Sequence, residues 1–151
     1  MHVYRICRRP FRALDGEGAR RWGGRWNSPG RPVVYTSATL SLAALEYLVH
    51  LDPGDAPRDL VAMTIEIPDD VEIATVDRAS LPAKWARVPE HPACVERGDA
   101  WLREGRTAAL RVPAAPVPEE NNVLIDPRHA SAALVTVVSE RAFVFDPRLV
   151  G

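Results

Sequence analysis

Glu46 is the residue of this sequence best placed to do chemistry with a carboxylate. In a helix expected over residues 38–51, a rotation of about 100° per residue brings Glu46 close to Leu42 and Val49. Leu45 lies on the same broad face. Carboxylates are seldom fully buried without a partner, because removing the charge from water costs free energy. A lone acid in this apolar stripe is either a helix-edge residue that reaches water or a positioned functional group, and the periodicity leaves both interpretations open.

A second candidate is the segment Gly-Gly-Arg-Trp-Asn-Ser-Pro-Gly at residues 23–30. Paired glycines let a backbone approach a ligand closely or adopt positive φ. Arg25 stands between these glycines and Trp26, so a cation and an aromatic plane come together, a combination that suits a ligand with both a phosphate and a ring. A turn built around a core tryptophan explains the same residues, and this alternative also stays open.

Other common catalytic signatures do not fit. Gly16 and Gly18 begin a G-x-G-x-x-G pattern, but Arg21 stands where its third glycine is required. There is no P-loop, no G-x-S-x-G and no H-E-x-x-H, and Cys7 and Cys94 form no C-x-x-C pair. The histidines are scattered and are expected to be surface or packing residues: His2, His50, His91 and His129. We therefore expect no metal site and no P-loop or serine-hydrolase chemistry.

Composition narrows the function further. The chain has 151 residues, which predicts one domain, and its 19 basic and 20 acidic residues give a net charge of -1. This balance disfavours direct binding of nucleic acid, which usually requires a basic excess. No apolar run approaches the ~20 residues of a membrane span, and the first residues lack the apolar stretch of a secretory signal. A cytoplasmic protein with reduced thiols is expected.

Short apolar runs separated by Pro and Gly indicate the elements that must position these residues. Strands are expected at 3–6, 32–37, 61–67, 109–112, 123–125, 134–138 and 142–145. Helices are expected at 38–51, capped by Thr39 or Ser41, and at 99–104, ended by Gly105, whereas 15–31 is expected to be a long loop. The sequence therefore predicts a single α+β domain with a mostly antiparallel sheet and a few short helices.

Several motifs follow one another in a specific order, although none is specific alone. They are Gly23–Asn27, Val34–Ser37, Leu42–Glu46, Gly98–Leu102, Leu110–Pro113, Asn122–His129 and Phe145–Arg148. The series spans nearly the whole chain and resembles the RES-domain family, the toxins of bacterial RES–Xre toxin–antitoxin pairs. The resemblance implies that residues 1–151 form one RES domain with an ADP-ribosyltransferase-like fold.

The family is named for an arginine, a glutamate and a serine. Arg25 matches the arginine and Glu46 the glutamate, but Ala114 stands where the serine is expected after Val112-Pro113. The resemblance implies that Glu46, Arg25 and Tyr35 are the catalytic residues. It also implies that NAD is bound by Arg25, Trp26, Asn27, Tyr35, Ser37, Ala114 and Asn122.

The implied activity is cleavage of the nicotinamide–ribose bond of NAD, which depletes NAD and arrests growth. Breaking this bond builds positive charge on the ribose, as in glycoside hydrolysis, and Glu46 would stabilise it. Arg25 would clamp diphosphate or ribose oxygens, and Tyr35 would stack on a ring and donate its hydroxyl. Water, phosphate and protein all stay open as acceptors, so the chain is expected to be an NAD glycohydrolase or phosphorylase, or alternatively an ADP-ribosyltransferase that modifies a protein.

Ala114 adds a third alternative, a catalytically inactive homologue that still binds antitoxin. Alanine loses a hydrogen bond worth roughly 0.5–1.5 kcal/mol, and we expect NAD turnover to be attenuated, either naturally or by an engineered substitution. The resemblance further implies an Xre-type helix-turn-helix antitoxin as partner, a homodimer and a hetero-oligomeric complex with the antitoxin. NAD is the expected substrate, without a metal or a membrane.

Overall fold

The computed structural model describes residues 1–151 and contains one seven-stranded sheet in the order β4-β5-β6-β2-β1-β3-β7. The strands are β1 (His2–Arg8), β2 (Val34–Ser37), β3 (Leu60–Glu66), β4 (Ile73–Thr75), β5 (Ala109–Pro113), β6 (Asn121–Ile125) and β7 (Thr136–Phe143). Only β4 and β5 pair in parallel. The predicted α+β architecture with a mostly antiparallel sheet is confirmed.

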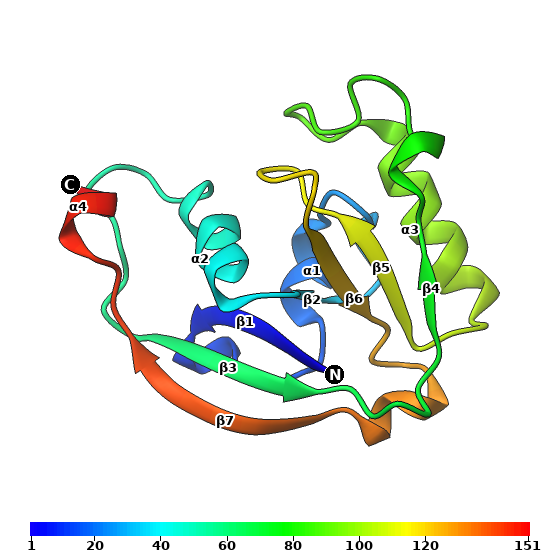
Figure 1. Ribbon diagram of the computed structural model, residues 1–151, viewed down its shortest axis with the longest axis horizontal. Coiled ribbons are helices and arrows are strands. Elements are labelled where there is room, and N and C mark those ends of the chain that lie inside the picture. Colours follow the sequence, from blue (N-terminus) through cyan, green and yellow to red (C-terminus); the bar gives the residue numbers. More distant parts are fainter.

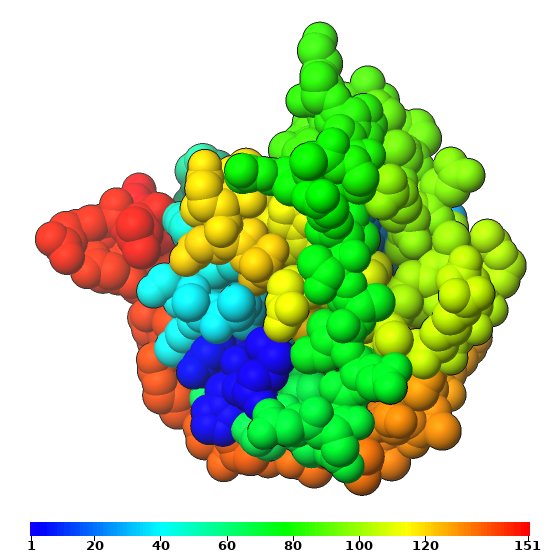
Figure 2. All heavy atoms as spheres, turned by 45° about the vertical axis from the view of Figure 1, so that its right-hand side comes forward, coloured from blue at the N-terminus to red at the C-terminus, as the bar shows by residue number.

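Four helices and three short 3₁₀ turns accompany the sheet. The helices are α1 (Glu17–Trp22), α2 (Leu40–Leu48), α3 (Pro92–Glu104) and α4 (Pro147–Val150). Figure 1 shows α2 over the middle of the sheet beside β1 and β2, and α3 at the far end beside β4 and β5. In Figure 2, α4 and the green segment that joins β4 to α3 project from the body of the molecule. None of these helices has the length and apolar character needed to cross a bilayer.

Alternation along the central strands divides the apolar residues between two main clusters. Val123 and Ile125 of β6 belong to one cluster, whereas Leu124 belongs to the other, together with Trp26. Successive side chains of a strand point to opposite faces. The face that carries Leu124 must therefore also carry Asn122, two residues earlier.

The register of β2 against β6 completes this face. Tyr35 pairs with Leu124 and Ser37 pairs with Asn122. Cross-strand partners place their side chains on the same side of a sheet. Tyr35, Ser37 and Asn122 thus share one face, near the start of α2.

The expected helix over 38–51 is present as α2, which is shorter at both ends (Leu40–Leu48) and has Thr39 as its cap. The Thr39 hydroxyl accepts a hydrogen bond from the Leu42 backbone N–H at 3.1 Å. The expected loop over 15–31 is partly wrong, because it contains α1. Glu17 stabilises this short helix by ion pairs with Arg20 and Arg21, three and four residues later.

Three other expectations need correction. Two separate strands are expected at 134–138 and 142–145, but the structure has a single strand, β7, in this region. The polar residues in the middle of β7 are tolerated because β7 is an edge strand and both of its faces are exposed. The helix at 99–104 begins earlier, since Pro92 occupies its first turn and the His91 side chain caps it. Strand β4 was not expected; its three residues are too few to show a period.

Candidate active site

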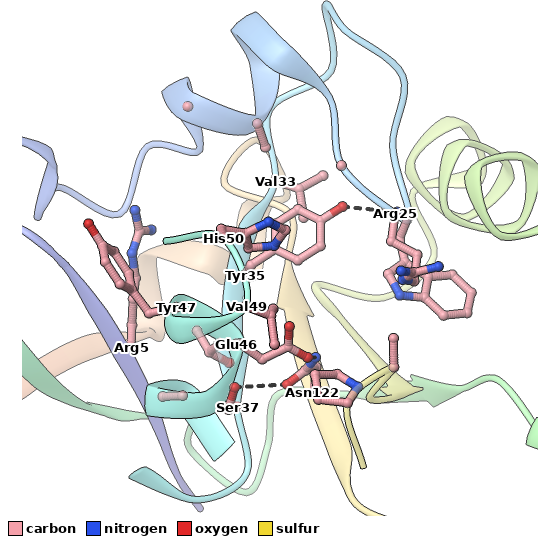
Figure 3. A pocket seen from close by; sticks show the side chains of 18 of the residues that line it. Arg5, Arg25, Val33, Tyr35, Ser37, Glu46, Tyr47, Val49, His50 and Asn122 are labelled. Atoms are coloured by element: carbon pink, nitrogen blue, oxygen red, sulfur yellow. Dashed lines mark hydrogen bonds between the residues drawn. The ribbon is translucent and has the colours of Figure 1, made fainter. Parts of the chain in front are cut away.

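A cleft of about 850 Å³ opens between α2, the Gly23–Trp26 segment and the central strands, a size typical of small-molecule sites. Glu46 and Arg25 both line it, together with Tyr35, Ser37 and Asn122. Figure 3 shows these side chains with Glu46 near the middle of the cleft and Arg25 on one side. The structure thus gathers, at one cavity, residues that lie up to about a hundred positions apart in sequence.

Glu46 is held by a chain of two hydrogen bonds. The Asn122 side-chain amide donates to Glu46 Oε1 at 2.5 Å, and the Ser37 hydroxyl donates to Asn122 Oδ1 at 2.8 Å (Figure 3). Both Ser37 and Asn122 are buried. Glu46 is half-buried, and its Oε2 receives no hydrogen bond from the protein. It is a carboxylate with one oxygen fixed by the sheet and the other without a protein partner.

Leu45 is 38% exposed and Val49 58% exposed, whereas Leu42 is fully buried. The apolar stripe around Glu46 is therefore only partly covered by protein. Helix α2 lies at the edge of the cleft, so that Glu46 sits between a buried face and an open one. Glu46 is therefore a helix-edge residue, as the first interpretation has it, and its carboxylate is also held in one place by Asn122, as the second requires.

Arg25 is engaged by the loop that precedes α3. Its Nη1 donates to the backbone carbonyls of Trp85 at 3.0 Å and of Arg87 at 2.9 Å. It forms no ion pair, and its other nitrogens make no hydrogen bond to the protein. Arg25 thus ties the Ala86–Glu90 wall of the cleft in place and keeps part of its guanidinium free.

Tyr35 and Asn27 shape the backbone around Arg25. The Tyr35 hydroxyl donates to Asn27 Oδ1 at 2.7 Å and accepts a hydrogen bond from the Trp26 N–H at 3.1 Å. Burial raises the pKa of Tyr35 above its ordinary value, so the phenol remains a donor. A Cβ at Gly24 would lie 2.7 Å from the Tyr35 hydroxyl oxygen, which explains the glycine there. The hydroxyl expected to act on substrate is used inside the protein.

Trp26 and Asn27 have structural side chains. Trp26 is 2% exposed and packs against Trp85, with ring centroids 6.3 Å apart. Asn27 is 1% exposed, and its amide nitrogen donates to three backbone carbonyls of the surrounding turn. Trp26 is one of the residues that line the cleft, whereas Asn27 does not line it. The segment is thus a turn built around a buried tryptophan, and it also brings Arg25 to the wall of the cavity.

Ala114 is fully buried and does not line the cleft. Its N–H donates to the Glu120 carbonyl at 3.0 Å, which extends the β5–β6 pairing beyond Pro113. By alternation from Val112, which faces Asn122 across the two strands, Ala114 lies on the Asn122 side of the sheet. A hydroxyl at this position would therefore lie on the same face of the sheet as Asn122.

Helix α3 supports the Arg25 segment from behind. The Asp99 carboxylate accepts hydrogen bonds from the Ser28 N–H at 2.9 Å and the Ser28 hydroxyl at 2.5 Å. A Cβ at Gly98 would lie only 1.6 Å from the Trp26 carbonyl oxygen, so the helix and the segment are in direct backbone contact. No three His, Cys, Asp or Glu side chains come together as a metal site.

Sequence reasoning did not assign several of the polar residues that also line the cleft, among them Arg5, Tyr47 and His50. Arg5 belongs to β1, and the other two lie at the end of α2 and just beyond it. Strand alternation would have placed Arg5 on one face of β1, but no local pattern indicates that this face borders a cavity. The signal is tertiary, since β1 and α2 are brought together only by packing.

Comparisons with known proteins agree with this architecture. The family model described as RES domain matches residues 2–146. The chain is 39% identical to "Prs ADP-ribosylating toxin" of Sphingobium sp. (strain YBL2), over 91% of this chain and 86% of that protein. It is 36% identical to "Toxin Res" of Yersinia enterocolitica and 39% identical to "Toxin Res" of Pseudomonas putida, each over 99% of both chains.

A solved structure shares the fold. It is the M. tuberculosis MbcT–MbcA toxin–antitoxin complex, matched with a TM-score of 0.77 over 95% of this chain and 84% of that chain. The sequence identity is 21%, so this likeness concerns the arrangement of helices and strands.

Proposed function

This chain belongs to the RES-domain family, and on that premise we propose that it is the toxin of a toxin–antitoxin pair and that it cleaves the nicotinamide–ribose bond of NAD. Two relatives that match along 99% of both chains are named Toxin Res, which supports the toxin role. The name of a third, an ADP-ribosylating toxin, supports chemistry on an ADP-ribose donor such as NAD.

The observation that carries the proposal is the Glu46 carboxylate held in the cleft by Asn122. Cleavage of the glycosidic bond makes the ribose carbon positive, as in glycoside hydrolysis. A fixed negative charge stabilises this state without having to reorganise. Glu46 Oε2, which has no protein partner, is the oxygen that would face the ribose.

Arg25 supports this chemistry in two ways. Its free nitrogens can bind ribose or phosphate oxygens of NAD, because a guanidinium offers several donors in one plane. Its Nη1 holds the Trp85–Arg87 backbone and so keeps one wall of the cleft closed. Tyr35 acts through the same segment, since its hydroxyl fixes the turn that carries Arg25. Tyr35 is therefore proposed as a positioning residue.

Ala114 is compatible with activity in this proposal. The Ser37 hydroxyl already orients Asn122, which in turn orients Glu46. A serine at 114 would add a further donor beside that chain, so its replacement by alanine weakens the orientation of Glu46 and leaves the carboxylate in place. We therefore propose attenuated turnover rather than an inactive protein.

Incubation of the purified chain with labelled NAD, with and without bacterial lysate, tests the proposal. Release of nicotinamide with free ADP-ribose, or with a phosphorylated derivative, supports NAD degradation. Label on a protein supports ADP-ribosyl transfer, the alternative favoured by the name of one relative. No loss of NAD at any protein concentration would contradict both and would support an antitoxin-binding homologue without chemistry.

We also propose a protein antitoxin of the Xre type as partner, a homodimer within that complex, and action in the cytoplasm, where NAD is available. The related fold was solved in a complex with an antitoxin, which supports the first of these. Co-expression of this chain with a helix-turn-helix protein encoded beside it should relieve growth arrest and yield a stable complex on gel filtration.

A further inference from the structure

The motif at residues 145–148 has no part in the chemistry proposed for the cleft, yet it lies against the helix that carries Glu46. It follows β7 and leads into α4. Figure 1 shows the chain turning up after β7 to reach α4, on the same side of the sheet as α2. The segment 144–150 is thus brought beside α2 from the other end of the chain.

Phe145 is the residue of this segment that packs most closely against α2. Its side chain is 4% exposed, and the centroid of its ring lies 6.1 Å from that of Tyr47. The ring of Phe143, at the end of β7, meets Phe145 edge to face at 5.0 Å. Aromatic pairs separated by roughly 4.5–7 Å attract each other beyond the effect of the area they bury. Phe145 therefore connects the end of β7 to the residue that follows Glu46.

The end of α2 has few other contacts to hold it. Only Leu42 and Ala43 of this helix are buried, and both lie in its first half. Tyr47 and Leu48 are partly buried against one apolar cluster. Phe145 is the one buried residue of that cluster that comes from outside α2 and the strands β1 and β3. Since residues 52–55 beyond the helix are exposed, no chain on that side replaces it.

The other residues of the motif fix the turn that follows Phe145. The Asp146 carboxylate accepts a hydrogen bond from the Arg148 backbone N–H at 2.9 Å and one from the Arg148 guanidinium at 2.8 Å. Pro147 occupies the first turn of α4, where a backbone N–H has no helical partner. The whole motif therefore serves to present the Phe145 ring to α2.

We propose that Phe145 is a positioning residue for Glu46. By packing on Tyr47 it holds the end of α2, and with it the Glu46 carboxylate, at the distance from β6 that the hydrogen bond from Asn122 requires. Asn122 fixes the carboxylate from the sheet, and Phe145 fixes the helix that carries it. A displacement of about 1 Å can cost a large part of a catalytic effect. The effect on turnover rests on the proposed function, whereas the restraint of α2 by Phe145 does not.

Two substitutions of Phe145 test this role. In Phe145→Ala, kcat for NAD should fall roughly tenfold to a hundredfold, with KM changed much less, because Glu46 loses its orientation while the ligand keeps its contacts. Phe145→Leu keeps most of the apolar volume and should retain most of kcat. All variants are compared well below their melting temperatures, so that each is folded, and Phe145→Leu keeps the test decisive if Phe145→Ala does not fold.

Ile67→Ala is the matched control for a loss of stability alone. Ile67 is 1% exposed and belongs to a different core cluster from α2 and Phe145. Its truncation should lower the melting temperature and leave kcat unchanged. An equal loss of kcat in Ile67→Ala and Phe145→Ala would overturn the positioning role, because any weakened core would then have the same effect.

Combination with Asn122→Ala shows whether Phe145 acts through the orientation of Glu46. If both residues act on that orientation, the double variant should have a kcat close to that of Asn122→Ala alone. If the two losses of kcat multiply instead, Phe145 acts independently of Glu46 and the proposed role is wrong.

Amide hydrogen exchange gives a readout that needs no NAD. In Phe145→Ala, exchange at residues 46–49 should become roughly tenfold faster relative to β5, and in Ile67→Ala this ratio should not change. If the wild type consumes no NAD but the ratio rises in Phe145→Ala, the proposed function fails and the restraint of α2 stands. If the wild type consumes NAD and Phe145→Ala keeps its kcat and its exchange ratio, the positioning role fails and the proposed function stands.

Discussion

Asn122 donates a hydrogen bond to Glu46 at 2.5 Å, and this contact joins residues 76 positions apart in the chain. Strand β6 supplies the amide and α2 the carboxylate, so the sheet and the helix fix one oxygen of Glu46 together. The Ser37 hydroxyl fixes the amide in turn. The orientation of the carboxylate therefore depends on the β2–β6 register as well as on α2.

Replacement of Asn122 tests this relationship. In Asn122→Ala, NAD turnover should fall about tenfold to a hundredfold, because Glu46 loses the group that orients it. The buried Ser37 hydroxyl also loses its acceptor, which should lower the free energy of unfolding by about 1–3 kcal/mol. Steady-state kinetics and urea unfolding measure the two effects. Asn121→Ala is the control, since the neighbouring side chain makes no hydrogen bond and should leave kcat unchanged.

Position 114 tests whether a second hydroxyl improves the same orientation. Ala114→Ser should raise NAD consumption, because the new hydroxyl lies on the Asn122 side of the sheet. Ser37→Ala should lower it, and the effect of Ala114→Ser should be larger in the Ser37→Ala background if both hydroxyls act on one chain. Equal NAD consumption by Ala114→Ser and the wild type would show that Ala114 does not attenuate this protein.

Arg25 should stabilise the loop before α3 independently of any ligand. Arg25→Lys should remove the pair of hydrogen bonds to Trp85 and Arg87, because Nη1 makes both of them and the lysine side chain is one bond shorter than arginine is to Nη1. Amide hydrogen exchange at Trp85 and Arg87 should become faster in this variant without NAD. Unchanged exchange, compared with Arg58→Lys, would show that Arg25 does not restrain the loop.

The ion pairs of α1 predict a pH dependence of stability. Hydrogen bonds from Arg20 lower the pKa of Glu17 from its ordinary 4.5 to about 2. A carboxyl whose folded pKa is depressed stabilises the protein above its unfolded pKa and loses this effect as the pH falls toward the folded value. The difference in Tm between the wild type and Glu17→Gln should therefore be present at pH 6 and shrink from about pH 4.5 to about pH 2. A difference that is constant with pH would contradict the assignment.

The elements that could be predicted from sequence are those with a clear period or a cap. Thr39 marked the start of α2, and the spacing of apolar residues around Glu46 identified the helix. The motif series located Arg25, Glu46 and Asn122, which do meet at one cleft. Helix α1 was missed because the surrounding glycines indicated a loop, and its stability comes from Glu17 pairing with two arginines.

The remaining features depend on tertiary contacts. Nothing local distinguishes a buried Asn27, which bonds three carbonyls, from one that contacts a ligand. Trp26 is buried because it packs against Trp85 and α3. Ala114 is placed by the backbone hydrogen bond that extends the β5–β6 pairing. Arg5 could not be assigned to the cleft, since the packing of α2 on β1 creates that wall.

The central claim is that Glu46 provides the charge that makes NAD cleavage possible, and NAD consumption by Glu46→Gln tests it most directly. Glutamine keeps the shape of the side chain and removes the charge. The account predicts that kcat falls roughly a hundredfold or more, with a melting temperature close to that of the wild type. Glu96→Gln, an exposed glutamate of α3, should retain full activity. Equal NAD consumption by Glu46→Gln and the wild type would contradict the account.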